Sequence, residues 1–494
     1  MTALEVQQLS ISIDGRALVD GVSFDVSPGE CVAIVGESGA GKSLTASALL
    51  GLAPGRVSAA ALVIDGMDVG HLAESQWRSV RGDRVALVSQ DALVSLDPLR
   101  RIGAEVAEPL AIHARLSRAQ RRERALELLG SVAMPSPESR AAQYPHELSG
   151  GLRQRALIAS ALAAQPAVLV ADEPTTALDA TVQAHVLALL RDIVDAGTAL
   201  VFITHDFSAV RRLADRVLVM RAGRVIEQGP VSEVLDAPAE AYTRELIAAT
   251  EHEPRDDRFG LGEAVLTGIE VSKAFAGVPA VADASFTLLQ GQTLGIVGES
   301  GSGKTTLARM IVGVETPDAG DLRWAGDHRV QLVHQNPLGA FDPRWTIDRS
   351  LREALAAGGV PRAQRASRVA ALMDEVGLAL ELAGRRPAQL SGGQRQRAAI
   401  ARALAAEPDV LVLDEPVSAL DPSVRERVLQ LLGRLQRDRG LTMIFVSHDL
   451  DVVAAVSDDV LVMQDGVIVE QGPVAAVFDA PQHPFTQELL AAGR

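Results

Sequence analysis

The sequence predicts an α/β fold that is built twice in one chain, and three observations lead to that prediction. Short apolar runs alternate with longer helical patterns, which is typical of a parallel sheet covered by helices. A glycine-rich motif follows one such run, as Gly298-Glu299-Ser300-Gly301-Ser302-Gly303-Lys304-Thr305. The same motif occurs earlier as Gly36-Glu37-Ser38-Gly39-Ala40-Gly41-Lys42-Ser43. One match can arise by chance, but two in the same strand-to-helix setting indicate a duplicated domain.

The glycine-rich motif has the spacing of a phosphate-binding loop. Its glycines allow a tight turn in which successive N–H groups point at a triphosphate, and the following helix adds its positive dipole end. Lys42 and Lys304 are expected to reach the outer phosphates. The hydroxyls of Ser43 and Thr305 are expected to bind Mg²⁺. The motif therefore predicts two nucleotide sites that use ATP and Mg²⁺.

The duplication extends well beyond the two motifs. Lys42 and Lys304 are 262 residues apart (304 − 42), and the same offset relates Phe24 to Phe286. The offset falls to 242 (391 − 149) at Ser149 and Ser391. Most of the difference, about 17 residues, is lost between phosphate loop and glutamine in the second copy, where the first copy has residues 57–84. We expect a polar, partly loop-like surface arm there, shortened in the second copy.

Each copy has the same expected order of elements. An alternating stretch that suits antiparallel strands is followed by a buried strand with the phosphate loop, an Arg- and Ala-rich helical segment, and two apolar strands. These stretches are 22–26, 31–43, 100–140, 167–170 and 199–203 in the first copy, and 285–289, 294–305, 346–386, 410–413 and 442–446 in the second. A charged stretch with Pro and Gly, 251–260, separates them. We expect a first domain over 1–250, a linker over 251–263 and a second domain over 264–494.

Composition narrows the classes of function. The formal net charge of −16 argues against a general nucleic-acid binder, because that function needs a basic face. The N-terminus lacks the pattern of a signal peptide, and no run of about 18 apolar residues is present, so we expect any membrane role to come through a partner. The single cysteine, Cys31, is expected to be a small buried hydrophobe, and one cysteine suits a reducing compartment.

Acidic pairs end one apolar strand in each copy, as Asp172-Glu173 and Asp414-Glu415. At the carboxyl edge of a parallel sheet the Asp would lie beside the phosphate loop and hold Mg²⁺ through water. The Glu would then polarise the water that attacks the terminal phosphate. The alternative is a pair of surface acids that cap the next helix.

Histidine and glutamine complete the expected group. His205 and His448 follow the second apolar strand of each copy, where the imidazole could contact the terminal phosphate or hold the attacking water. Gln90 and Gln335 end other apolar runs, and each amide could touch Mg²⁺ or water. A structural histidine and an unimportant exposed glutamine are the alternatives.

A second anion-binding pattern precedes a helix in each copy, as Ser149-Gly150-Gly151 and Ser391-Gly392-Gly393-Gln394. Each copy already has a phosphate loop. The second pattern therefore makes most sense if it binds the nucleotide held by the other copy.

The order phosphate loop, glutamine, Leu-Ser-Gly-Gly, Asp-Glu and His resembles the ATP-binding cassette ATPases over nearly the whole chain. The resemblance implies tandem P-loop NTPase domains, each with a RecA-like parallel-sheet core, an antiparallel β subdomain and an α-helical subdomain. It also implies intramolecular head-to-tail pairing, in which each ATP lies between one copy's phosphate loop and the other copy's signature. The loops Thr176–Asp179 and Ser418–Asp421 match the segment that crosses between copies.

The segments 90–98 and 335–343 and the tail Ala480–Thr486 resemble, more narrowly, the oligopeptide, dipeptide and nickel importer ATPases. This resemblance implies an ATPase that energises solute import, with two transmembrane permease subunits and an extracytoplasmic solute-binding protein as partners. The chain would lie peripherally on the cytoplasmic face of the inner membrane. A soluble tandem-cassette ribosome factor, a sugar-importer ATPase and a scaffold without turnover are the alternatives.

Two positions differ between the copies in ways that bear on nucleotide binding. Phe275 stands where the family stacks an aromatic ring on adenine, and the first copy has Ile13 there, so the first site is expected to hold ATP more loosely. Leu152 replaces Gln394 in the first signature, as in related first-half subunits. Both glutamates and both histidines are present, so we expect two competent sites.

Overall fold

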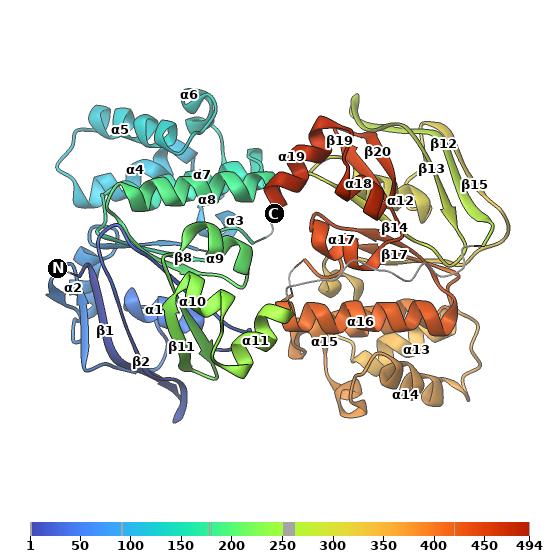
Figure 1. The fold of residues 1–494 in the computed structure, drawn as a ribbon, viewed down its shortest axis with the longest axis horizontal. Coiled ribbons are helices and arrows are strands. Elements are labelled where there is room, and N and C mark those ends of the chain that lie inside the picture. The colour runs from blue at the N-terminus through green and yellow to red at the C-terminus, as the bar shows by residue number, and fades with distance from the viewer. Residues whose placement is uncertain are drawn as a thin grey trace. The chain divides into compact units, whose positions relative to one another are not determined.

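The computed structural model describes residues 2–89, 92–176, 178, 180–249, 262–418 and 420–493. It divides into two compact units, with the main division between Thr250 and Glu251. Figure 1 colours the first unit from blue to green and the second from yellow to red.

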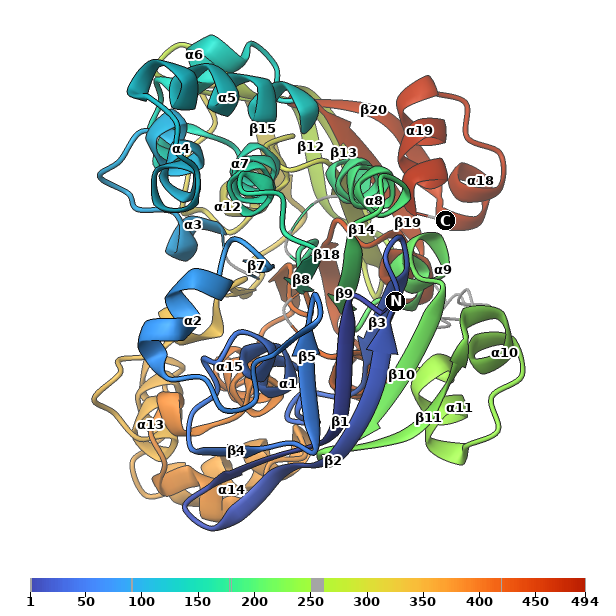
Figure 2. The ribbon, with the colours of Figure 1, turned by 90° about the vertical axis from the view of Figure 1, so that its left-hand side faces the viewer.

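The first unit is built on a six-stranded sheet in the order β11-β10-β3-β9-β8-β7 (Figure 2). Its strands are β3 (Cys31–Val35), β7 (Val85–Val88), β8 (Val168–Asp172), β9 (Ala199–Ile203), β10 (Arg216–Arg221) and β11 (Arg224–Pro230). All neighbours pair in parallel except β10 and β11. Every residue of β3 and β9 is buried, as expected for strands whose two faces are both covered by other elements.

A second, antiparallel sheet in this unit has the order β2-β1-β5-β6, and β4 also pairs with β1. Its strands are β1 (Leu4–Ile13), β2 (Arg16–Val26), β4 (Arg56–Ser58), β5 (Ala61–Ile64) and β6 (Met67–Asp68). The two sheets share one hydrophobic core with helix α1 (Lys42–Leu49), in which Ile11 and Phe24 pack with Ile34 and Leu49. This core fixes the start of α1, where the phosphate loop ends.

The helices of the first unit cover the parallel sheet or form a separate helical layer. They are α1 (Lys42–Leu49), α2 (Glu74–Val80), α3 (Ala92–Ser95), α4 (Ile102–His113), α5 (Arg118–Ser131), α6 (Pro137–Ala141), η1 (Pro145–Glu147), α7 (Gly150–Leu162), α8 (Ala180–Asp195), α9 (Phe207–Leu213), α10 (Val231–Asp236) and α11 (Ala241–Ala248). Local sequence sets several starts. Ser117 and Asp206 accept bonds from the first turns of α5 and α9 as N-caps.

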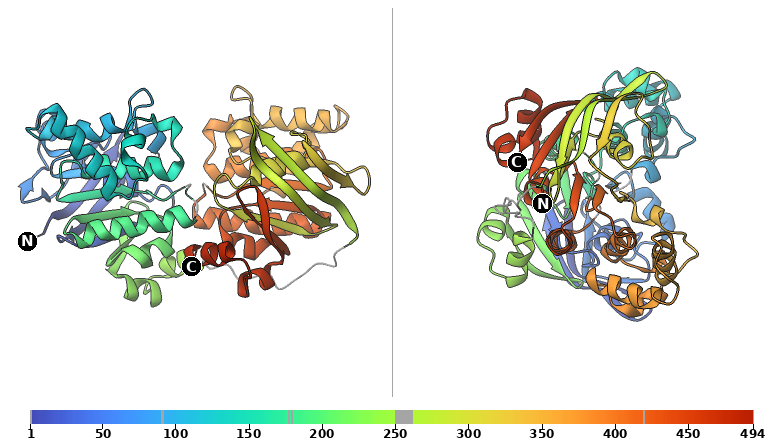
Figure 3. Two further views of the ribbon diagram at one scale, coloured as in Figure 1. Left: turned by 90° about the horizontal axis from the view of Figure 1, so that it is seen from above. Right: turned by 90° about the vertical axis from the view of Figure 1, so that its right-hand side faces the viewer.

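The second unit repeats the plan (Figure 3), with a six-stranded sheet in the order β16-β17-β18-β14-β19-β20 and a three-stranded sheet, β13-β12-β15. Its strands are β12 (Ala264–Phe275), β13 (Val278–Leu289), β14 (Thr293–Gly298), β15 (Ala319–Trp324), β16 (Val330–Val333), β17 (Val410–Asp414), β18 (Thr442–Val446), β19 (Asp459–Gln464) and β20 (Val467–Pro473). Its helices are α12 (Lys304–Ile311), η2 (Pro337–Ala340), α13 (Ile347–Ala357), α14 (Arg365–Glu375), η3 (Leu380–Gly384), η4 (Pro387–Gln389), α15 (Gly392–Leu404), α16 (Pro422–Arg439), α17 (Leu450–Val456), α18 (Val474–Asp479) and α19 (Pro484–Gly493).

The predicted α/β fold with two cassette-like domains is confirmed, and residues 57–84, which we expected to form a polar, partly loop-like arm, combine short strands and one helix with turns and loops. That region contains β4, β5, β6 and α2. Trp77 and Val80 of α2 are buried in the core beside Val85, so their apolar contacts hold the segment in place. Between α12 and β16 the second unit has the single strand β15.

The predicted domain boundaries stay a prediction, because most of the expected linker lies outside the described residues and β12 begins at Ala264. Among the residues that the structure describes, no helix has the length and apolar character needed to cross a bilayer.

Candidate functional site

The two phosphate loops have the same internal hydrogen bonds. The Lys42 ammonium donates to the carbonyls of Gly36 at 2.7 Å and Glu37 at 3.0 Å. In the second unit, the Lys304 ammonium donates to two carbonyls in the same way. Gly298 accepts at 2.9 Å and Glu299 at 2.7 Å. Both lysines are buried, so each loop encloses its own cation.

Glycine is required in the loops because they approach other backbone closely. A Cβ on Gly36 would lie 2.3 Å from the Met220 carbonyl oxygen, at the end of β10. A Cβ on Gly298 would lie 2.1 Å from the Met463 carbonyl oxygen, at the same place in β19. Such distances are far below van der Waals contact. Any side chain at these positions would push the loop off the sheet.

The predicted Mg²⁺ residues of each unit pair with each other. Ser43 Oγ donates to Asp172 Oδ1 at 3.2 Å, and Thr305 Oγ1 donates to Asp414 Oδ1 at 3.1 Å. Burial raises the pKa of both carboxyl groups, and the hydroxyl hydrogen bond only partly opposes that effect. The pairs join the start of α1 to the end of β8, and the start of α12 to the end of β17.

These oxygen pairs suit Mg²⁺. Magnesium prefers oxygen ligands and commonly binds through one or two protein groups, substrate phosphates and water. No cluster of three or more His, Cys, Asp or Glu side chains that could hold a metal lies within the described ranges. The protein groups present therefore fit a Mg²⁺ that is shared with a phosphate, held by Ser43 and Asp172 or by Thr305 and Asp414.

The two glutamates have a strained backbone. Glu173 has φ +49° and Glu415 has φ +47°, a left-handed conformation that residues other than glycine rarely adopt. Each is held there by its backbone N–H, which donates to the Ile203 carbonyl at 2.8 Å or the Val446 carbonyl at 2.9 Å. These bonds reach the end of the neighbouring strand, β9 or β18.

The same geometry brings glutamate and histidine together. His205 Nδ1 lies 3.4 Å from Glu173 Oε1, and His448 Nδ1 lies 3.4 Å from Glu415 Oε1. Burial raises the pKa of each glutamate, but hydrogen bonds and positive charges, those of the histidine first among them, together outweigh burial, and the net pKa is lowered. Both glutamates are therefore poised as carboxylates.

The glutamine prediction has a structural counterpart in the second unit. Gln335 Nε2 donates to Glu415 Oε2 at 2.7 Å, which puts this amide beside the acidic pair. In the first unit, Thr176 Oγ1 donates to Glu173 Oε2 at 3.0 Å. Gln90 lies outside the described residues, as do Ala177, Asp179 and Ala419 of the expected crossing loops.

The signature segments start helices, as predicted, but the two starts differ. Ser391 caps α15 by accepting from Gln394 N at 3.3 Å, and the Gln394 side chain accepts from Ser391 N at 3.0 Å. This is a reciprocal capping box. Ser149 is at the N-cap position of α7 but makes no side-chain capping bond, and Leu152, in the place of Gln394, has no side-chain oxygen for the reciprocal bond. The first signature is therefore less firmly fixed.

One glycine in each signature is tightly packed against a valine side chain. A Cβ on Gly151 would lie 2.4 Å from Val182 Cγ1, and one on Gly393 would lie 2.2 Å from Val424 Cγ1. Those valines belong to α8 and α16, the helices that follow the crossing loops. The preceding glycines, Gly150 and Gly392, have ordinary contacts only, with the nearest atom at 3.6 Å or 3.5 Å.

The predicted adenine-stacking residue, Phe275, is at the end of β12 and is 46% exposed. The Lys273 ammonium lies 5.6 Å from its ring centroid. Ile13, at the matching end of β1, is only partly exposed. A partly exposed aromatic ring is therefore present in the second unit at a position where the first unit has an aliphatic side chain.

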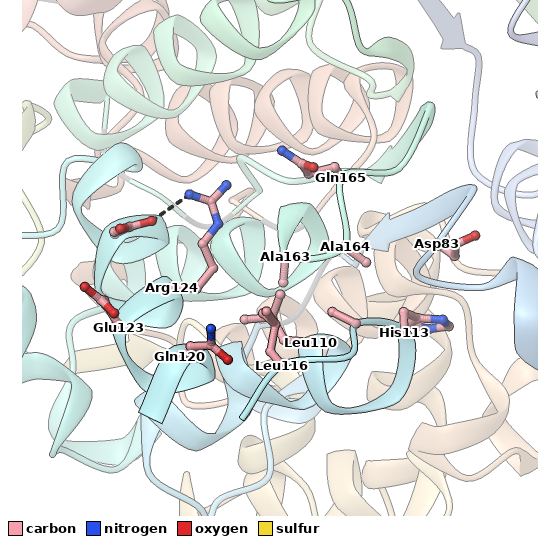
Figure 4. Close-up of a pocket in the computed structure, with 12 residues that line it drawn as sticks. Asp83, Leu110, His113, Leu116, Gln120, Glu123, Arg124, Ala163, Ala164 and Gln165 are labelled. Atoms are coloured by element: carbon pink, nitrogen blue, oxygen red, sulfur yellow. Dashed lines mark hydrogen bonds and ion pairs between the residues drawn. The ribbon is translucent and has the colours of Figure 1, made fainter. Parts of the chain in front are cut away.

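Two cavities lie away from these groups. One of about 450 Å³ in the first unit is lined by residues of α4, α5 and the turn that follows α7, among them His113 and Arg124 (Figure 4). Another cavity, of about 530 Å³, lies in the second unit and is lined by residues of β16, α13 and α15. Neither is lined by a phosphate loop or an Asp-Glu pair. The candidate nucleotide groups thus lie outside both cavities.

Comparison with known families accounts for this arrangement. The model described as ABC transporter matches residues 19–176 and 281–418. The chain belongs to the ABC transporter family. The model described as the C-terminal region of oligopeptide and dipeptide transporters matches 469–493, which confirms the narrower resemblance of the tail. As an ABC ATP-binding subunit, the chain is an ATPase.

Relatives of this ABC protein match it over almost its full length. It is 42% identical to the peptidoglycan transport ATP-binding protein YejF of Agrobacterium fabrum, over 99% of this chain and 96% of that protein. It is 41% identical to the glutathione import ATP-binding protein GsiA of Escherichia coli K12, over 96% of this chain and 86% of that protein. Archaeal ribosome recycling factor aABCE1, solved with stalk protein aP1, shares the fold with a TM-score of 0.64. It is 22% identical and covers 94% of this chain and 88% of that chain.

Sequence reasoning missed one contact of the first phosphate loop. The hydroxyl of Tyr242, on α11, accepts a hydrogen bond from Glu37 N at 3.3 Å. No local motif indicates it, because 205 residues separate the partners. What the sequence does offer is an alignment of the C-terminal ends of the two halves, in which Tyr242 matches Phe485 and so has a hydroxyl that its counterpart lacks.

Proposed function

We propose that this ABC ATPase energises the import of small peptides or peptide-like solutes across the inner membrane. One observation carries the proposal: two cassettes and a peptide-transporter tail occur in one chain that matches YejF and GsiA nearly end to end. Those relatives are named for peptidoglycan transport and glutathione import. In this proposal the chain is peripheral and works with two permease subunits and a solute-binding protein.

Uptake by cells lacking the gene tests the proposal. Labelled dipeptide, glutathione and a peptidoglycan-derived peptide should be compared with nickel and with a disaccharide. Loss of uptake of one of the first three, restored by the intact gene but not by a Glu173→Gln, Glu415→Gln double variant, is the expected result. Loss confined to the disaccharide would replace the peptide proposal with a sugar importer. Normal uptake of all five, with altered ribosome recycling, would favour the ribosome-factor alternative.

Within each site, we propose the following roles. Lys42 and Lys304 bind the outer phosphates, and the Ser43–Asp172 and Thr305–Asp414 pairs would hold Mg²⁺. When bound, Mg²⁺ would neutralise phosphate charge.

Glu173 and Glu415 orient and deprotonate the attacking water, and His205 and His448 hold those carboxylates in place. The depressed pKa of both glutamates supports this role, since a base must be ionised. Removal of either carboxylate should lower turnover by about 10²- to 10⁴-fold at that site.

We also propose that each ATP contacts the phosphate loop of one half and the signature of the other. The support is chemical: each signature places a serine at the N-terminus of a helix, which suits an anion, in a half that has its own phosphate loop. Paired cysteines test this in a Cys31→Ala chain, which leaves no other thiol. In a chain that cannot hydrolyse ATP, Ser38→Cys should form an ATP-dependent disulfide with Ser391→Cys. A disulfide with Ser149→Cys instead would refute the proposal.

The segments after the glutamines are proposed to contact the permeases. Val94 is 81% exposed and Leu99 is 85% exposed, so this short segment offers two large aliphatic side chains to a partner. In the second unit Leu338 is 40% exposed. A photo-crosslinker at Leu99 should capture a membrane subunit, whereas one at exposed Arg115 serves as the control. Equal labelling at both positions would contradict a specific contact.

A further inference from the structure

The last helix of the first unit holds the first phosphate loop through one hydroxyl. Tyr242 lies in the first turn of α11, is 7% exposed, and accepts from Glu37 N at 3.3 Å. The Arg221 guanidinium lies 4.6 Å from the centroid of its ring and helps to fix it. The Glu37 carbonyl in turn accepts from the Lys42 ammonium at 3.0 Å. Glu37 is therefore bonded to the tail on its N–H side and to the catalytic lysine on its carbonyl side.

This bond complements a second external contact of the same loop. The backbone N–H of Gly223, in the turn between β10 and β11, donates to the Ala40 carbonyl at 3.0 Å. One contact lies at Glu37, near the start of the loop, and the other at Ala40, near its end. Together they restrain the segment whose N–H groups face a phosphate.

The second half has the counterpart of the glycine contact but has no hydroxyl at the position of Tyr242. Gly466 N donates to the Ser302 carbonyl at 3.1 Å, as its counterpart does in the first half. Phe485 takes the place of Tyr242 (485 − 242 = 243), and Gln464 takes the place of Arg221 (464 − 221 = 243). Phe485 is buried, with 6% exposure, and its side chain has no oxygen to accept a hydrogen bond.

The two tails are otherwise seated alike. Glu227 of β11 accepts from Ala239 N at 2.7 Å, just before α11. Glu470 of β20 accepts from Gln482 N at 2.8 Å, just before α19. The equivalent carboxylate thus anchors each tail helix to the sheet. The two tails differ in the hydroxyl of Tyr242, which contacts the first phosphate loop.

We propose that Tyr242 is a positioning residue of the first phosphate loop and makes the two ATP sites unequal. By holding Glu37 it pre-orders the first loop, so less ordering remains to be done when phosphate binds. The second loop, with Phe485, does without that restraint. The effect opposes the looser adenine contact expected from Ile13. The proposal depends on the ATPase and not on the transported solute.

ATP binding to one loop at a time tests the proposal. In a Lys304→Ala chain binding reports the first loop, and in a Lys42→Ala chain it reports the second. Tyr242→Phe, which keeps the ring beside Arg221, should weaken binding about two- to tenfold in the Lys304→Ala chain. It should leave binding unchanged in the Lys42→Ala chain. Equal affinity with and without the hydroxyl in both chains, or an equal loss in both, would overturn the proposal.

Amide hydrogen exchange gives a readout that a general loss of stability would not produce. Tyr242→Phe should speed exchange in the peptide covering 36–43 and leave the peptide covering 298–305 unchanged. Phe485→Tyr is the matched gain-of-contact variant and should slow exchange in 298–305. Unchanged exchange at 36–43 in Tyr242→Phe would show that the hydroxyl does not restrain the loop.

Discussion

Replacing the second glycine of the second signature should cost more than replacing its neighbour, although both changes add one methyl group. The added Cβ of Gly393→Ala would lie 2.2 Å from Val424 Cγ1. Carbon atoms normally approach to about 3.5 Å, so α15 or α16 must move by about 1 Å. Gly392→Ala meets its nearest atom at 3.5 Å, an ordinary contact.

Overpacking of this kind costs about 1–3 kcal/mol, partly offset by up to about 1 kcal/mol of helix propensity gained from alanine. We therefore expect Gly393→Ala to destabilise the second unit by about 1–2 kcal/mol. In a unit of this size that lowers the midpoint of thermal unfolding by about 2–8 °C. Gly392→Ala should be neutral or slightly stabilising.

Calorimetry of the full chain measures the difference, and a third variant tests the cause. Val424→Ala removes the methyl group that the new Cβ would strike. In a double-mutant cycle, Gly393→Ala and Val424→Ala together should be more stable than the sum of the single effects predicts. If Gly393→Ala unfolds at the same temperature as Gly392→Ala, or if Val424→Ala gives no recovery, the steric reasoning is refuted.

Three further predictions concern the ATP sites. The folded pKa of Glu415 lies below its ordinary value of 4.5, so its ionised form stabilises the fold above pH 4.5 and that contribution is lost as the pH falls through the folded pKa. His448→Ala removes the bond that lowers this pKa, so the acid limb of ATP turnover and acid unfolding should both move to higher pH; unchanged profiles would contradict the assignment. Phe275→Ala should weaken ATP binding by about two- to tenfold with little change from Ile13→Ala, as titration of each chain would show, whereas equal effects would exclude stacking. Gln394→Leu removes the capping box and should cost about 0.5–1 kcal/mol in thermal unfolding, and the same loss from Gln394→Glu, which keeps the acceptor, would argue against capping.

Most of the features that the sequence predicted correctly belong to local motifs. The phosphate loops, the Asp-Glu pairs and the helix starts at Ser149 and Ser391 follow from residues that are neighbours in the chain. The capping box at Ser391 is likewise visible as a Ser followed three residues later by Gln394. These features depend on short-range geometry that residue type and spacing determine.

Contacts between distant segments could not be read in the same way. The left-handed backbone of Glu173 depends on a bond to Ile203, and the hold on Glu37 depends on Tyr242. The order in α2 depends on Trp77 finding the core, although the segment reads as polar. Each of these features is set by tertiary packing, which overrides local propensity.

The carbonyl partners of Lys42 and Lys304 have a consequence for how firmly ATP is kept. A phosphate that bound either ammonium would compete with two carbonyl acceptors for its N–H donors, so displacing those carbonyls would yield only the difference between two sets of bonds. If the lysines bind the outer phosphates as proposed, they can return to these carbonyls when hydrolysis shortens the nucleotide. Such a resting position for the lysine would favour release of the product and repeated cycles of ATP hydrolysis over permanent binding of the nucleotide.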